Sequence, residues 1–95
     1  MSEYMEIEAE LDEEDLSKIH FYTNLALTGG DDEVEVYDSY QALAEGSPVA
    51  QALLAVAGIL TLEMAGQDMT ITRDLMIPEH EIMADVSAAL KDFFI

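Results

Sequence analysis

Residues 46–59 carry the signals for the start and the end of a short helix, followed directly by a strand. Ser47 can cap the first amide groups of a helix, and Pro48 suits its first turn because the φ angle of proline is already helical. Gly58 can adopt the left-handed conformation that ends a helix. In residues 59–64, Ile59, Thr61 and Glu63 then alternate with Leu60, Leu62 and Met64, as expected for the two faces of a strand. This stretch therefore predicts a helix over residues 48–57 that leads directly into a strand.

Alternation of apolar and polar residues predicts a hairpin near the start of the chain. Residues 4–11 alternate apolar residues with glutamates, residues 12–15 form a charged turn, and residues 16–27 form a second strand. Lys18 and His20 would face outward, opposite the glutamates of the first strand. The side chains expected in the core are Met5, Ile7, Ala9, Leu11, Ile19, Phe21 and Thr23.

A second hairpin and a second helix follow the central helix. Residues 59–64 and 69–73 alternate around a turn, and an amphipathic helix begins near Pro78. Val34 and Val36 can add a short edge strand, and residues 38–45 form a short helical turn. The apolar stripes expected on the two helices are Val49, Leu53 and Val56, and then Ile82, Val86, Ala89 or Leu90, and Phe93.

The order strand, strand, helix, strand, strand, helix predicts the fold class. Two hairpins that are each followed by a helix favour an α+β two-layer sandwich, with an antiparallel sheet and both helices on one face. Residues 1–95 fit a single small domain.

The net charge of −18 limits the partners of the chain. It arises from 21 acidic residues against the three basic residues Lys18, Arg73 and Lys91. Such a surface repels nucleic acids and anionic membranes, so we expect neither as a partner. It would attract a basic protein, and it equally suits high solubility or a salt-rich cytoplasm.

The residue content excludes further classes of protein. No apolar run approaches the ~20 residues of a membrane-spanning helix, and the acidic N-terminus lacks the features of a signal peptide, so we expect a cytoplasmic location. The chain has no cysteine. This excludes disulfides, a thiolate nucleophile, zinc sites with sulfur ligands and cysteine-held iron–sulfur clusters.

Three segments occur in the order found in a known family. They are residues 6–10 followed by Lys18-Ile19-His20-Phe21, then residues 45–59 with their Ser-Pro and Gly-Ile steps, then Met69-Thr70-Ile71-Thr72-Arg73. Together they make the chain resemble the N-terminal domain of NifU/Nfu-type iron–sulfur scaffold proteins. The resemblance implies a protein-contact role in iron–sulfur cluster assembly, with a cluster carrier or a target apoprotein as the partner.

The chain also departs from this family. The Cys-x-x-Cys pair that holds the cluster in a following domain of modular members has no counterpart here. The Asn-Pro-Asn-like turn before the second strand is replaced by Glu13-Glu14-Asp15, and the family's tryptophan is replaced within Leu75-Met76-Ile77. The cluster-holding role therefore does not carry over.

The residues that could carry chemistry have structural explanations. His80 lies between Glu79 and Glu81 at a helix start, but three consecutive residues spread around a helix and do not converge on a metal. Ser47 lacks a nearby histidine or a glycine elbow, and Gly29-Gly30 lacks the lysine of a phosphate loop. We expect no catalytic residue, no cofactor and no metal ligand.

The sequence therefore favours a non-enzymatic protein-interaction module. Its expected contact surface is the central helix with the second hairpin, represented by Ser47, Gln51, Leu54, Met64, Met69 and Arg73. The alternatives are a small protein that binds iron or another metal through carboxylates, and a regulatory or structural subunit unrelated to iron.

Overall fold

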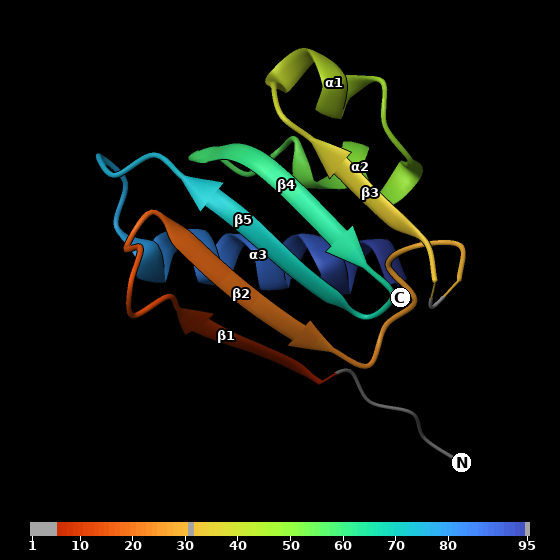
Figure 1. The fold of residues 1–95 in the computed structure, drawn as a ribbon, viewed down its shortest axis with the longest axis horizontal. Coiled ribbons are helices and arrows are strands. Elements are labelled where there is room, and N and C mark those ends of the chain that lie inside the picture. Colours follow the sequence, from red (N-terminus) through yellow and green to blue (C-terminus); the bar gives the residue numbers. More distant parts are fainter. Residues whose placement is uncertain (1–5, 31, 95) are drawn as a thin grey trace.

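In the part of the chain that the structure describes, five antiparallel strands form one sheet, and three helices accompany it (Figure 1). The computed structural model describes residues 6–30 and 32–94. Across the sheet the strands follow the order β1-β2-β5-β4-β3. In chain order the elements are β1 (Ile7–Leu11), β2 (Lys18–Thr23), β3 (Val34–Tyr37), α1 (Tyr40–Ala44), α2 (Pro48–Leu53), β4 (Ile59–Ala65), β5 (Asp68–Arg73) and α3 (Glu79–Phe94).

One face of the sheet is buried because alternate residues of its three central strands are apolar. Ile19, Ile71 and Leu62 lie opposite one another on β2, β5 and β4, and Phe21, Met69 and Met64 form the next such row. All six side chains are at most 2% exposed. The alternation in the sequence thus fixes which side of each strand meets the core.

The capping signals at α2 act as predicted, but the helix is shorter than expected. The Ser47 Oγ accepts a hydrogen bond from the Ala50 amide at 3.4 Å, and a proline follows at the first helical position. The helix ends at Leu53, and tighter turns replace residues 54–57 of the expected helix. Gly58 then takes a φ of 100° and leads into β4.

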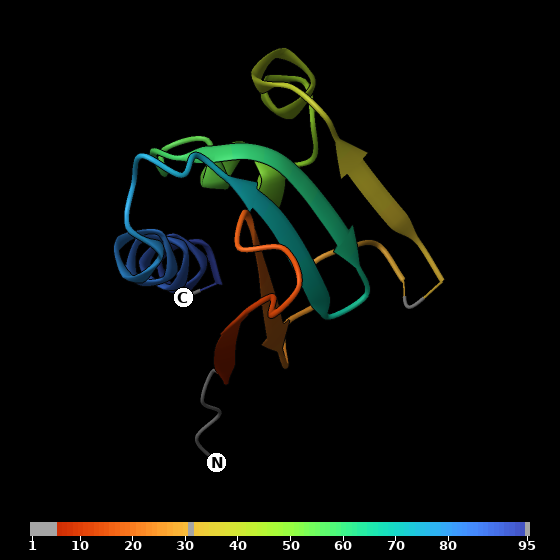
Figure 2. The same ribbon diagram turned by 60° about the vertical axis from the view of Figure 1, so that its left-hand side comes forward.

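The long helix α3 lies against one side of the sheet, as the two views show (Figures 1 and 2). Ile82, Val86 and Leu90 form its buried stripe, one turn apart along the helix. Phe93, which was expected to continue this stripe, is 40% exposed. Phe94 packs against the core instead and meets the ring of Phe93 edge to face at 5.0 Å.

The α+β class and the antiparallel sheet are confirmed, whereas the order of elements differs from the expected one. The structure has β-β-β-α-α-β-β-α, because Val34–Tyr37 forms a true strand beside β4 and residues 40–44 form the separate helix α1. The Ser39 Oγ caps α1 by accepting from the Ala42 amide at 3.1 Å. The short edge strand expected at Val34 and Val36 and the helical turn expected within residues 38–45 are both present, as β3 and α1.

The first hairpin forms, with both strands shorter than predicted. β1 begins at Ile7, and Met5 lies outside the described residues. β2 ends at Thr23, after which Leu25 and Leu27 turn into the core. Ile7 and Leu11 pack against the core as expected, whereas Ala9 on this edge strand is exposed and Thr23 is half-buried.

Gly58→Ala should lower the free energy of unfolding by about 1–3 kcal/mol, because a φ of 100° is strained for any other residue. An added Cβ would also meet the Cδ1 atoms of Ile82 and Ile77 at 3.0 and 3.1 Å. Urea unfolding followed by circular dichroism measures the change. Gly30→Ala is the control, since its Cβ would meet nothing within 4 Å. Equal effects of the two substitutions would contradict this account of Gly58.

Candidate functional site

The face of the sheet opposite the buried side carries a row of side chains that crosses all five strands. Glu10, His20, Thr70, Glu63 and Val36 lie opposite one another on β1, β2, β5, β4 and β3. They alternate with the core residues, so all five point away from the core. We call this side of the sheet the open face.

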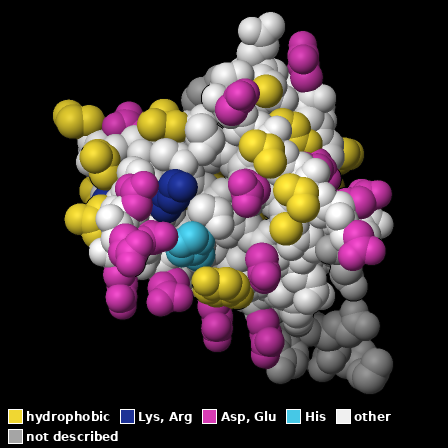
Figure 3. All heavy atoms as spheres, in the orientation of Figure 1, with side chains coloured by type: hydrophobic (Ala, Val, Ile, Leu, Met, Phe, Trp, Pro, Cys, Tyr) yellow, Lys and Arg dark blue, Asp and Glu magenta, His cyan; other side chains and the backbone are white. Residues whose placement is uncertain are grey.

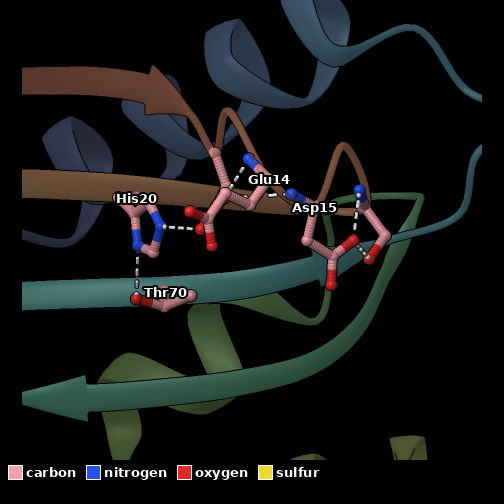
Figure 4. Close-up of polar contacts among 6 residues, drawn as sticks. Glu14, Asp15, His20 and Thr70 are labelled. Carbon is pink, nitrogen blue, oxygen red and sulfur yellow. Dashed lines mark hydrogen bonds and ion pairs between the residues drawn. The ribbon is translucent and has the colours of Figure 1, made fainter.

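A polar network lies at the centre of the open face (Figure 4). The Asp12 Oδ2 is 2.8 Å from the Nε2 of His20, and the Nδ1 of His20 is 2.9 Å from the Oγ1 of Thr70. The other oxygen of Asp12 accepts hydrogen bonds from the amides of Glu14 and Asp15 at 2.8 and 3.0 Å. The network therefore ties the turn after β1 to the central strand β5.

The Asp12 carboxylate determines how the His20 ring is protonated. An ionised carboxylate can only accept, so the Nε2 of His20 must carry a proton that it donates to Asp12. In the neutral ring, Nδ1 is then the acceptor for the Thr70 hydroxyl; in the charged ring, Nδ1 donates to it instead. Both protonation states of His20 therefore keep the two hydrogen bonds.

Hydrogen bonding keeps the Asp12 carboxyl ionised. The bond from His20, followed by the amides of Glu14 and Asp15, lowers the pKa of Asp12. The pKa of Asp15 is also lowered, chiefly by its side-chain bond from the Ser17 hydroxyl. Asp12 and Asp15 thus retain their negative charges in mildly acidic solution.

The carboxylate of Asp12, the imidazole of His20 and the hydroxyl of Thr70 are linked in the same order as the groups of a catalytic triad. The surroundings of the Thr70 hydroxyl, however, do not fit acyl transfer. Thr70 lies on β5, which is paired on one side with β2 and on the other with β4. The backbone N–H groups of such a strand are used in the sheet ladders, so they cannot stabilise an oxyanion. The arrangement instead provides a well-ordered polar centre on the open face.

Exposed apolar side chains stand on the same face, on β2 and on β3. Tyr22 is 43% exposed, and Val34 and Val36 are each 60% exposed. Leu60, at the irregularity where β4 meets β5, is 47% exposed. Figure 3 shows such hydrophobic side chains standing among carboxylates on this side of the molecule.

The structure separates the six contact residues proposed from the sequence. Met64 and Met69 are 0% and 2% exposed and lie within the core. Ser47 is occupied as the cap of α2, and Leu54 packs against the core. The exposed Gln51 donates from Nε2 to the Gly46 carbonyl oxygen at 3.0 Å. These residues therefore do not form one continuous surface.

Arg73, the sixth of these residues, is only 8% exposed. Its Nε donates to the Leu16 carbonyl oxygen at 2.8 Å, and its Nη1 donates to the Ile77 carbonyl oxygen at 3.0 Å. It thereby joins the loop before β2 to the loop before α3. Its role in the fold is that of an internal clamp.

Sequence reasoning missed Asp12 and Thr70 as members of a site. His20 was correctly placed outward, facing the glutamates of β1, and its direct partner is Glu10. Asp12 follows β1 immediately, so the register of the hairpin would have placed it near His20. Thr70 could not be found in this way, since its strand joins β2 only in the tertiary structure.

His80 is exposed at the start of α3. Within residues 6–30 and 32–94, no three or more His, Asp or Glu side chains are grouped so that they could hold a metal ion.

No described helix is both long enough and apolar enough to cross a membrane. No family model matches the chain, and no curated protein matches it.

Asp12→Asn should reduce stability at neutral pH, and its deficit relative to the native chain should shrink on acidification. The pKa of Asp12 in the folded state lies below the ordinary value of about 3.9. Its stabilising contribution is therefore present above that value and is lost as the pH falls through the folded pKa. Melting temperatures between about pH 7 and pH 2 measure the effect.

Asp32→Asn is the control for Asp12, because it removes one carboxylate at an exposed position. The difference in melting temperature between Asp32→Asn and the native chain should change with pH much less than the difference for Asp12→Asn does. A pH-independent deficit for Asp12→Asn would show that its ionisation does not stabilise the fold.

Arg73→Met should lower the free energy of unfolding by about 1–3 kcal/mol, because the Leu16 and Ile77 carbonyl groups would lose their donor. Lys91→Met, on the exposed side of α3, makes the same change of charge and should cost less than about 1 kcal/mol. Chemical unfolding of both variants makes the comparison. Equal losses would mean that charge alone, and not the clamp, accounts for the effect.

Proposed function

We propose that this chain is a non-enzymatic interaction module that binds a basic partner protein through the open face of its sheet. The observation that carries the proposal is the exposure of Tyr22, Val34 and Val36 among carboxylates, in a chain with a net charge of −18. Exposed apolar side chains rimmed by polar ones are typical of protein-binding surfaces.

The proposal includes a two-layer arrangement in which α2 and α3 both pack against the buried side of the sheet. Val49 and Leu53 of α2 and Ile82, Val86 and Leu90 of α3 join the same core cluster as the strands. With the helices on that side, the open face is left for a partner.

The charge around the open face specifies the chemistry of the partner. The exposed Lys18 lies on the open face in line with His20, no further lysine or arginine occurs before Arg73, and Arg73 is buried. The exposed Glu8, Glu10 and Glu63 project from strands of the open face. A basic surface would therefore be attracted to this face, and added salt would weaken the encounter.

The resemblance to NifU/Nfu-type N-terminal domains suggests which basic partner this is. We propose a carrier of iron–sulfur clusters or a target apoprotein, met in the cytoplasm. The support for this partner is the ordered match of three sequence segments, two of which contribute strands β2 and β5 of the open face.

Capture of partners from a cell extract tests the proposal with matched variants. The double variant Tyr22→Ser, Val36→Ser removes apolar side chains from the open face and should lose the captured proteins. The control Leu75→Ser, Met76→Ser removes side chains that are 65% and 88% exposed in the loop after β5, and it should capture as the native chain does. Quantitative mass spectrometry of the salt-eluted proteins provides the measurement.

Two outcomes would contradict separate parts of the proposal. Equal capture by both double variants would overturn binding through the open face. Loss of capture by the open-face variant, with no iron–sulfur carrier or apoprotein among the lost proteins, would retain the interaction module and remove the iron–sulfur partner.

A further inference from the structure

The strand β3 offers an unpaired edge beside the open face. It lies at one end of the sheet, and among the described strands it pairs only with β4. Val34 and Val36 are each 60% exposed. Figure 2 shows α1 beyond the end of β3, leaving the outer side of the strand uncovered. In an edge strand, every second residue directs its N–H and C=O groups outward, where another strand can pair with them.

The two edge strands of the sheet, β1 and β3, differ in how well they are protected against pairing with another chain. At the opposite edge, β1 presents Glu8 and Glu10 on the open face, and such charges discourage pairing with another chain. β3 has the sequence Val-Glu-Val-Tyr, with neither proline nor lysine, and its register with β4 is regular over all four residues. Its edge therefore lacks two of the usual obstacles to strand addition, proline and lysine, and the charge that it does carry is negative.

Contacts with the α2 region hold β3 in its extended form. The Tyr37 hydroxyl donates to the Glu35 carboxylate and accepts from the Ser47 amide at 3.1 Å. The backbone at Gly46 also lies so close to Tyr37 that an added Cβ would be 2.6 Å from the ring. An incoming strand would thus meet an edge that is already ordered, which lowers the entropic cost of pairing.

The charge around β3 determines what can occupy this edge. Asp32, Glu33, Glu35 and Asp38 surround the two valines, and no lysine or arginine lies within residues 32–38. A second copy of the chain would bring the same carboxylates and a net charge of −18 against them, which opposes self-pairing. A basic segment would be attracted instead.

We propose that the partner adds an extended, basic segment to the sheet as a strand beside β3. This inference rests on the proposed function and specifies how the partner binds. Apolar side chains of the segment would continue the open face next to Val34 and Val36. Its lysines or arginines would alternate with them and approach Glu35 and neighbouring carboxylates.

A synthetic peptide of alternating lysine and valine tests this mode of binding. It should bind the full chain and slow amide hydrogen exchange at residues 34–37. A peptide of the same length and charge, with a central valine replaced by proline, should bind at least about tenfold more weakly because it cannot complete the ladder. Isothermal calorimetry and exchange followed by NMR provide the two measurements.

Matched variants of the chain separate strand addition from attraction by charge. Val36→Lys places a positive charge at the edge and should weaken binding of the alternating peptide strongly. Leu75→Lys changes the net charge equally at an exposed position in the loop after β5 and should weaken it much less.

The possible outcomes distinguish this inference from the proposed function. Equal affinity for the two peptides, or unchanged exchange at residues 34–37, overturns strand addition. If the alternating peptide then still shifts the NMR signals of Tyr22 and Thr70, binding through the open face is retained and only strand addition beside β3 is rejected. Tighter binding of the alternating peptide, with protection of residues 34–37 and loss in Val36→Lys, supports the inference.

Discussion

Two rows of apolar side chains hold the three central strands in register, and the remaining structure is arranged around them. Ile19, Ile71 and Leu62 form one row, and Phe21, Met69 and Met64 form the other. A shift of one residue in any of these strands would move its apolar side chains to solvent and its polar side chains into the core. This constraint fixes the buried side of the sheet and, with it, the composition of the open face.

The open face combines features that oppose aggregation with features that favour binding. Its carboxylates and the net charge of −18 would repel a second copy of the chain. Its central network of Asp12, His20 and Thr70 is fully hydrogen-bonded and orders the polar surface. The exposed valines of β3 lie beside this polar centre, at the edge of the sheet. The basic partner that we propose would experience the attraction without the repulsion that a second copy would meet.

The hairpins, both main helices and most of the core could be predicted because their signals are local. Alternation placed Phe21 and Ile71 inward, and the Ser47-Pro48 pair marked the start of α2. Met64 and Met69 show where local reasoning fails, since methionine suits a core and a contact surface equally well. Only the pairing of β4 with β5 placed both methionines side by side in the core.

The sequence by itself determined the α+β class, the two hairpins and the acidic surface, because each depends on neighbouring residues or on total charge. The tertiary structure alone decided that β5 lies between β2 and β4, which brings Thr70 to His20 across 50 residues of chain. It also made β4 the neighbour of β3 and enclosed Arg73 as a clamp. These contacts join distant segments, and no local pattern specifies which strands become neighbours.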